Sequence, residues 1–145
     1  MARLTSENPL KASLIRGLHG LERQLNMDRN DIMLILLELD SEEKIVLFME
    51  WMLAHTEGGV VLVKPNEIVR AACNISDEIN ERDAAIQQLT EEMKKRGISV
   101  ELINDVLHIL ETTENYLVMI DALSSIEEPY EKNLLETAKF IAEEL

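Results

Sequence analysis

Cysteine, aromatic residues and long apolar runs are all scarce in this chain of 145 residues. The single cysteine, Cys73, excludes a disulfide within the chain. Aromatic residues make up only 3% of the sequence, so leucine, isoleucine, valine and methionine must fill the interior, which suits helix packing better than a β-sandwich. No run approaches the roughly 18 apolar residues of a membrane helix, and segment 1–8 has no apolar signal core. We therefore expect a cytoplasmic protein without a membrane-spanning segment.

Basic residues are also few, and the excess of acidic over basic residues differs between the two halves of the chain. The chain has 14 Lys and Arg against 28 Asp and Glu, a formal net charge of −14. Residues 1–72 hold 8 basic and 11 acidic residues, net −3, whereas residues 73–145 hold 6 and 17, net −11. A field of this sign repels phosphate backbones and anionic lipid. We expect no direct binding to nucleic acid or to a membrane surface, whereas this charge is compatible with a basic protein partner.

What the chain does have is apolar residues at helical spacing. Asn8-Pro9 is a capping residue followed by a first-turn proline, and five leucines between residues 10 and 25 share one face. Segments 32–39 and 42–53 are apolar nearly all round, which predicts two helices buried in the core. The remaining predicted helices cover residues 65–73, 77–96, 99–123 with a break near Thr112-Thr113, and 129–145. The pattern predicts an all-α fold, a helical bundle of about six to seven helices.

Two local features qualify this prediction. Gly17 and Gly20 weaken the first helix by about 1 kcal/mol each unless another backbone packs closely there. Residues 60–63 read Val-Val-Leu-Val and predict a short extended segment, interpreted as a linker because the best internal partner, residues 98–102, has a stronger claim as a helix start. We expect a single helical domain over residues 1–145. The alternative is two sub-lobes, an apolar-rich 1–74 and an acidic three-helix bundle over 75–145.

The predicted helix 77–96 carries a narrow apolar seam. Ile79, Ile86 and Met93 recur at seven-residue steps, and Leu89 lies on the same side. Such a seam pairs with a partner helix, for instance in a homodimer, or packs against helices of its own chain. The sequence leaves both alternatives open.

Acidic residues supply a weak metal-site pattern. Asp105 and His108 are three residues apart and share a helix face, with Glu101 one turn away. Metal sites in helical bundles need matching ligands from other helices, usually a second Glu-x-x-His, and the sequence has none. A solvated polar stripe is the simpler interpretation.

The same region resembles part of a known enzyme family. Glu78 and Glu81 form a Glu-x-x-Glu pair, and Glu101 with Asp105 forms a second carboxylate pair on a later helix. This arrangement resembles the all-α nucleotide pyrophosphohydrolases of the MazG type, and the resemblance implies that the four carboxylates hold Mg²⁺ against nucleotide phosphates. The second pair departs from the family pattern because its members are four residues apart instead of three, which still places them on one face.

Residues 65–76 resemble a helix-turn-helix unit, with a turn near residues 74–76. Its second helix begins with Asp77 and Glu78, however, and such carboxylates would face the phosphate backbone of DNA. The pattern therefore predicts a packing unit and no DNA reading.

No catalytic constellation is complete in the sequence, so function is predicted largely by exclusion. The leading hypothesis is a non-enzymatic helical interaction or regulatory protein that acts through protein–protein contacts and uses no cofactor. The alternative is the magnesium-dependent hydrolase, which alone would need Mg²⁺. A third hypothesis is an acidic mimic of nucleic acid that inhibits a basic partner.

Overall fold

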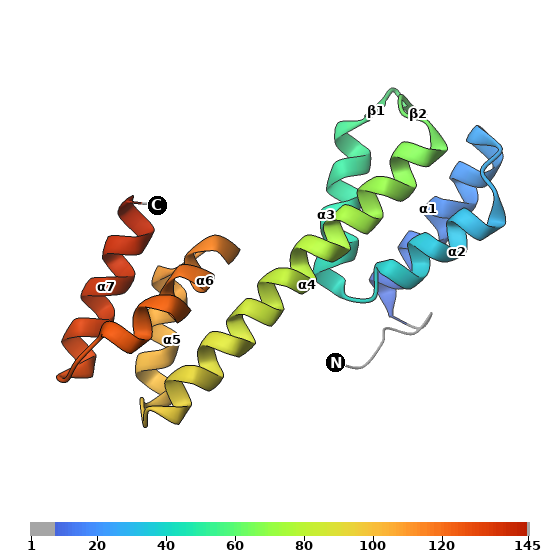
Figure 1. Cartoon of the computed structure of the whole chain (residues 1–145). Helices are drawn as coiled ribbons and strands as arrows, with labels where there is room; N and C mark the ends of the chain where they lie inside the picture. The colour runs from blue at the N-terminus through green and yellow to red at the C-terminus, as the bar shows by residue number, and fades with distance from the viewer. Residues whose placement is uncertain (1–7, 145) are drawn as a thin grey trace. The chain divides into compact units, whose positions relative to one another are not determined.

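The computed structural model describes residues 8–144 and confirms the all-α prediction (Figure 1). Residues 1–7, for which the sequence predicts no signal core, and Leu145, in the last predicted helix, lie outside the described part. The chain forms two compact units, Met1–Ile79 and Asn80–Leu145, and α4 runs through both. In chain order the elements are α1 (Pro9–Leu25), α2 (Arg29–Glu38), α3 (Glu42–Ala54), β1 (Thr56–Glu57), β2 (Val60–Val61), α4 (Pro65–Lys95), α5 (Val100–Ile109), α6 (Thr113–Ala122), the 3₁₀ turn η1 (Leu123–Ser125) and α7 (Tyr130–Glu144).

Short polar side chains cap helices at their N-terminal ends, and Asn8 does so where the sequence predicts a cap. The Asn8 side chain accepts hydrogen bonds from two backbone N–H groups in the first turn of α1, at 3.0 and 3.2 Å. Ser41 caps α3 and Ser99 caps α5 in the same way. Thr112 caps α6, which confirms the predicted break. These bonds satisfy donors that a helix cannot pair internally.

In the first unit, α1 packs against α2 and α3. Asn8 donates to the Glu42 side chain at 3.0 Å, so the N-terminal ends of α1 and α3 lie together. Near the other end, the Gln24 amide donates to the Gly59 carbonyl at 3.1 Å and its oxygen accepts from the Val61 N–H at 3.0 Å. The two helices therefore run side by side in the same direction. The buried core of this unit consists of Leu14, Leu18, Leu21, Met27, Ile32, Ile35, Leu39, Ile45, Phe48, Ile68 and Ala72.

The predicted break at residues 74–76 is wrong, because α4 continues through it from Pro65 to Lys95. Cap-type residues stand there, but neither proline nor glycine follows Pro65 until Gly97. Ser76 is only 1% exposed on this continuous helix. The segment that resembles a helix-turn-helix unit therefore has no turn. Gly97, at φ +75°, ends the helix as predicted, and the Ile98 N–H donates to the Met93 carbonyl at 3.2 Å.

The extended segment is present, but the interpretation as an unpaired linker is wrong for its first half. Val60–Val61 pairs antiparallel with Thr56–Glu57. Gly58 and Gly59 connect the strands at φ +58° and +80°. Two consecutive residues with positive φ form the tight turn that suits a two-residue hairpin, and glycine adopts it without steric cost.

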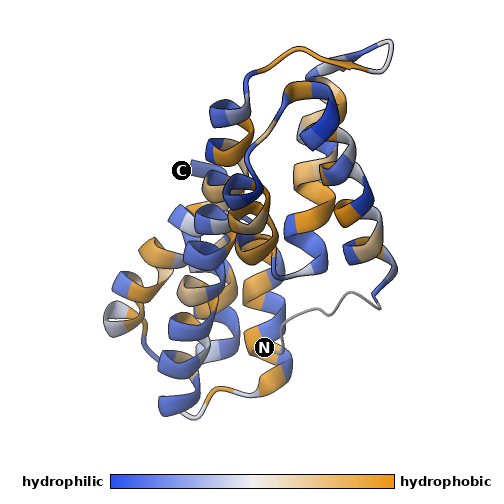
Figure 2. Ribbon diagram, turned by 90° about the vertical axis from the view of Figure 1, so that its right-hand side faces the viewer, coloured by the Kyte–Doolittle hydropathy of each residue, from blue (hydrophilic) through white to orange (hydrophobic). Residues whose placement is uncertain are grey.

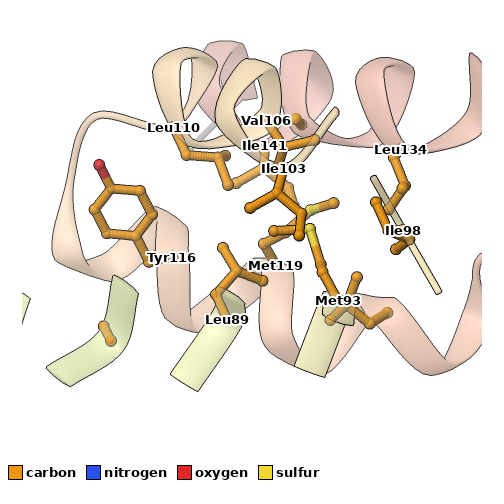
Figure 3. Close-up of a cluster of buried hydrophobic side chains, with 13 residues drawn as sticks. Leu89, Met93, Ile98, Ile103, Val106, Leu110, Tyr116, Met119, Leu134 and Ile141 are labelled. Atoms are coloured by element: carbon orange, nitrogen blue, oxygen red, sulfur yellow. The ribbon is translucent and has the colours of Figure 1, made fainter. Parts of the chain in front are cut away.

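In the second unit, α7 packs against both α5 and α6. Leu89 and Met93 of α4 point into the same cluster as side chains from the three later helices (Figure 3). The cluster contains one aromatic ring, that of Tyr116. Its buried members are Ala85, Leu89, Met93, Ile98, Ile103, Val106, Leu110, Tyr116, Met119, Leu123, Leu134, Ala138 and Ile141.

The prediction that α2 and α3 are buried all round is wrong. Each helix buries one face, yet Met33 of α2 is 61% exposed and Leu53 of α3 is 75% exposed. The apolar colour that Figure 2 gives to helical ribbons thus marks both core and surface residues. The physical reason is that Met33 lies on a side of α2 away from the core of this unit, whereas Leu53 lies at the open edge of the contact between α3 and α1. The exposed large apolar residues of this unit are Met33, Leu34, Leu37, Val46, Leu47, Leu53, Val60 and Leu62.

Candidate functional site

An apolar groove lies between α1 and α3 and has a volume of about 340 Å³. Helix α1 contributes Leu14, Gly17, Leu18 and Leu21. Helix α3 contributes Phe48, Met49, Met52 and Leu53. The parallel course of the two helices, fixed at both ends by the contacts of Asn8 and Gln24, holds these residues in two facing rows.

The polar groups at the groove are few and have defined partners. The Thr56 hydroxyl donates to the Met52 carbonyl at 2.6 Å. Ser13 lines the groove, and its hydroxyl oxygen accepts from Nη2 of the exposed Arg16 at 3.2 Å. A guanidinium group therefore lies next to an otherwise apolar groove.

Gly17 contributes to this groove because it has no side chain. No other backbone packs closely on Gly17 or Gly20, because a Cβ at either position would meet nothing within 4 Å. Only Gly17 lines the groove. Close packing of helices does not explain either glycine.

The five candidate metal ligands are all exposed. Glu78 and Glu81 lie on α4, and Glu101, Asp105 and His108 lie on α5. Across residues 8–144, no three His, Cys, Asp or Glu side chains are placed to hold a metal ion. Within α5 the spacing puts Asp105 one turn from Glu101 and from His108, but no further ligand joins them.

The predicted seam on α4 belongs largely to the interior. Leu89 and Met93 are fully buried in the core of the second unit, and Ile86 packs against that core. Ile79 is 5% exposed. Packing within the chain thus accounts for the spacing of Leu89 and Met93 without a partner helix.

A second cavity, of about 310 Å³, lies where α3 faces the start of α4. The rings of Trp51 and His55 stack there with centroids 4.1 Å apart and planes 25° apart. His55 Nδ1 lies 2.8 Å from the Trp51 carbonyl oxygen, the geometry of a donated hydrogen bond. Glu67, which also lines the cavity, accepts from the Lys64 backbone N–H at 3.2 Å and so caps α4. These contacts stabilise the helix ends.

Cys73 is a poor nucleophile in this environment. Burial raises the pKa of its thiol, and the negative charges of Glu38 and Asp77 raise this pKa further. The thiolate is the reactive form of cysteine, and here it is disfavoured.

The fold and the groove define a small all-α protein with an apolar groove on one helical unit. Comparison with protein-family models, with curated proteins and with solved structures gives no match to this chain. Among the described helices, none combines the length and the apolar character needed to cross a membrane.

Sequence reasoning missed the groove. The sequence does carry two signals for it. Segments 32–39 and 42–53 are apolar nearly all round, and the first helix contains Gly17. Periodicity predicts that Phe48, Met49 and Met52 lie in the core. Only the packing of α3 on α1 shows that these residues line an open groove.

Proposed function

We propose that this chain is a non-enzymatic helical interaction protein that acts through protein–protein contacts of its first unit. The observation that supports the proposal is the α2 outer face, formed by Met33, Leu34 and Leu37. These side chains are 61%, 39% and 49% exposed and lie within one turn of each other. Contiguous exposed apolar groups are costly in water and mark interaction sites when they gather on one surface.

A second copy of the chain is the partner we propose for this face. Two α2 helices related by a two-fold axis would bury the same three side chains from each chain. The three side chains of this face are uncharged, and the charged residues Arg29 and Glu38 lie one helical turn from Met33 and Leu34, respectively. Repulsion between two copies of net charge −14 then acts over longer distances, where salt screens it. Self-association should therefore strengthen at higher ionic strength, whereas binding to a basic partner should weaken.

Sedimentation equilibrium at low and high salt tests this proposal. The variant Leu37→Gln should shift the wild-type dimer toward monomer. Leu117→Gln on α6, where Leu117 is 48% exposed, is the matched control and should leave the dimer intact. A wild type that stays monomeric at both salt concentrations, or an equal effect of the two substitutions, would refute self-association through α2.

A further inference from the structure

The α1/α3 groove has the chemistry of a site for an apolar ligand. Its volume of about 340 Å³ falls at the lower end of the range of roughly 300–1,000 Å³ for small-molecule pockets. Leu53 at its edge is 75% exposed, so a ligand that covers it removes apolar surface from water. Met49 and Met52 line the same side, and their unbranched side chains adapt to the shape of a ligand. Residues 14–21 of α1 extend about 10 Å along the groove, the scale of a medium-length acyl chain.

Arg16 adds a charge preference. Its guanidinium bonds to Ser13 at the groove, it is exposed, and no carboxylate within residues 8–144 forms an ion pair with it. That is unusual in a chain with twice as many acidic as basic residues. Arginine is permanently charged and its planar fork matches a carboxylate. The free donors of this side chain therefore favour an anionic group at the end of the groove near Ser13.

Gly17 leaves space in the same part of the groove. Glycine inside a helix is less stable than alanine, and here a Cβ would meet nothing within 4 Å. Packing in the unbound chain therefore gives no reason for glycine at position 17. A side chain at this position would project into the groove and reduce the space for a ligand.

We propose that the α1/α3 groove binds a medium-chain amphipathic carboxylate of the fatty-acid type, with its acyl chain between the two helices and its carboxylate at Arg16. The apolar rows supply affinity, and Arg16 supplies the preference for an anionic head group. This site is separate from the α2 outer face and does not depend on self-association.

Calorimetric titration of the full chain with sodium decanoate, below its micellar concentration, tests the proposal. Octanoate should bind more weakly by about fourfold for each methylene lost. Decanol should bind more weakly than decanoate, and decyltrimethylammonium more weakly still, because each lacks the pairing with Arg16. Equal affinity for the anionic and cationic amphiphiles, or no binding of decanoate, would overturn the proposal.

Two variants locate the binding. Gly17→Leu fills the groove and should reduce decanoate affinity at least tenfold, whereas Gly20→Leu is its matched control on the exposed part of the same helix and should bind as the wild type does. Arg16→Gln should weaken decanoate binding without changing decanol binding, and it tests the site even where Gly17→Leu perturbs α1. Equal binding by the two glycine variants, or no effect of Arg16→Gln on decanoate, would show that decanoate binds elsewhere.

Discussion

Lys11 joins the start of α1 to the end of α2, and its removal should destabilise the first unit. The Lys11 residue is only 8% exposed, and its ammonium donates to the Leu36 carbonyl at 2.6 Å and lies 3.4 Å from the Leu39 carbonyl. The last carbonyls of a helix have no partner within the helix and carry its partial negative charge. Helix α2 has no basic residue in its own last turn. Lys11 therefore supplies from a neighbouring helix the charge that the α2 sequence lacks.

The substitution Lys11→Met keeps the apolar stem and removes the ammonium. A hydrogen bond from a charged group contributes about 1.5–3 kcal/mol, and the interaction with a helix C-terminus adds about 0.3–1 kcal/mol. We expect Lys11→Met to lower the free energy of unfolding of the first unit by about 2–3 kcal/mol. The loss arises because the partly buried Leu36 carbonyl loses its charged donor.

Urea denaturation followed by tryptophan fluorescence measures this effect, because Trp51 is the one tryptophan of the chain and lies in the first unit. The urea midpoint should fall by about 1–2 M. Arg16→Met is the control: it removes an exposed cation from the same helix and should change stability by no more than about 0.5 kcal/mol. If Lys11→Met is as stable as Arg16→Met, the ammonium does not stabilise the end of α2.

Three further predictions concern other parts of the chain. Leu89→Ala removes a side chain that is 0% exposed and should destabilise the second unit by about 2–5 kcal/mol in thermal melts followed by circular dichroism; a loss under about 1 kcal/mol would contradict the assignment of Leu89 to the core. Ser99→Ala removes the N-cap of α5 and should cost about 1 kcal/mol in the same melts, and an unchanged melting temperature would show that the cap does not stabilise the helix. Cys73 should react with a thiol reagent more slowly than free cysteine at mildly alkaline pH, because burial first and then Glu38 and Asp77 raise its pKa; the rate should rise with pH, and a rate equal to that of free cysteine would contradict this. The folded chain holds the thiol proton of Cys73 more tightly than the unfolded chain does. The contribution of this thiol to the free energy of unfolding is therefore lost as pH rises from its pKa in the unfolded chain through its pKa in the folded chain.

The helices of this protein follow from local chemistry, and the sequence is sufficient to predict most of them. Asn8, Ser99 and Thr112 satisfy N–H groups within three residues of themselves, and Gly97 adopts the positive φ that ends α4. Such interactions depend on neighbours in the chain and can be read from spacing. The break predicted near Ser76 fails because a capping residue only permits a helix to start, and packing of the surrounding turns favours continuation.

The tertiary structure decides which apolar side chains are exposed to solvent. Periodicity groups Met33 with Leu37, and Met49 with Met52, but it does not say which apolar face another helix covers. That depends on contacts between residues far apart in sequence, such as those that set α1 beside α3. The α1/α3 groove, the α2 outer face and the solvent-facing candidate carboxylates are all consequences of this packing. The sequence alone determined that the chain folds into helices, and the way those helices pack decided which residues a ligand or partner can reach.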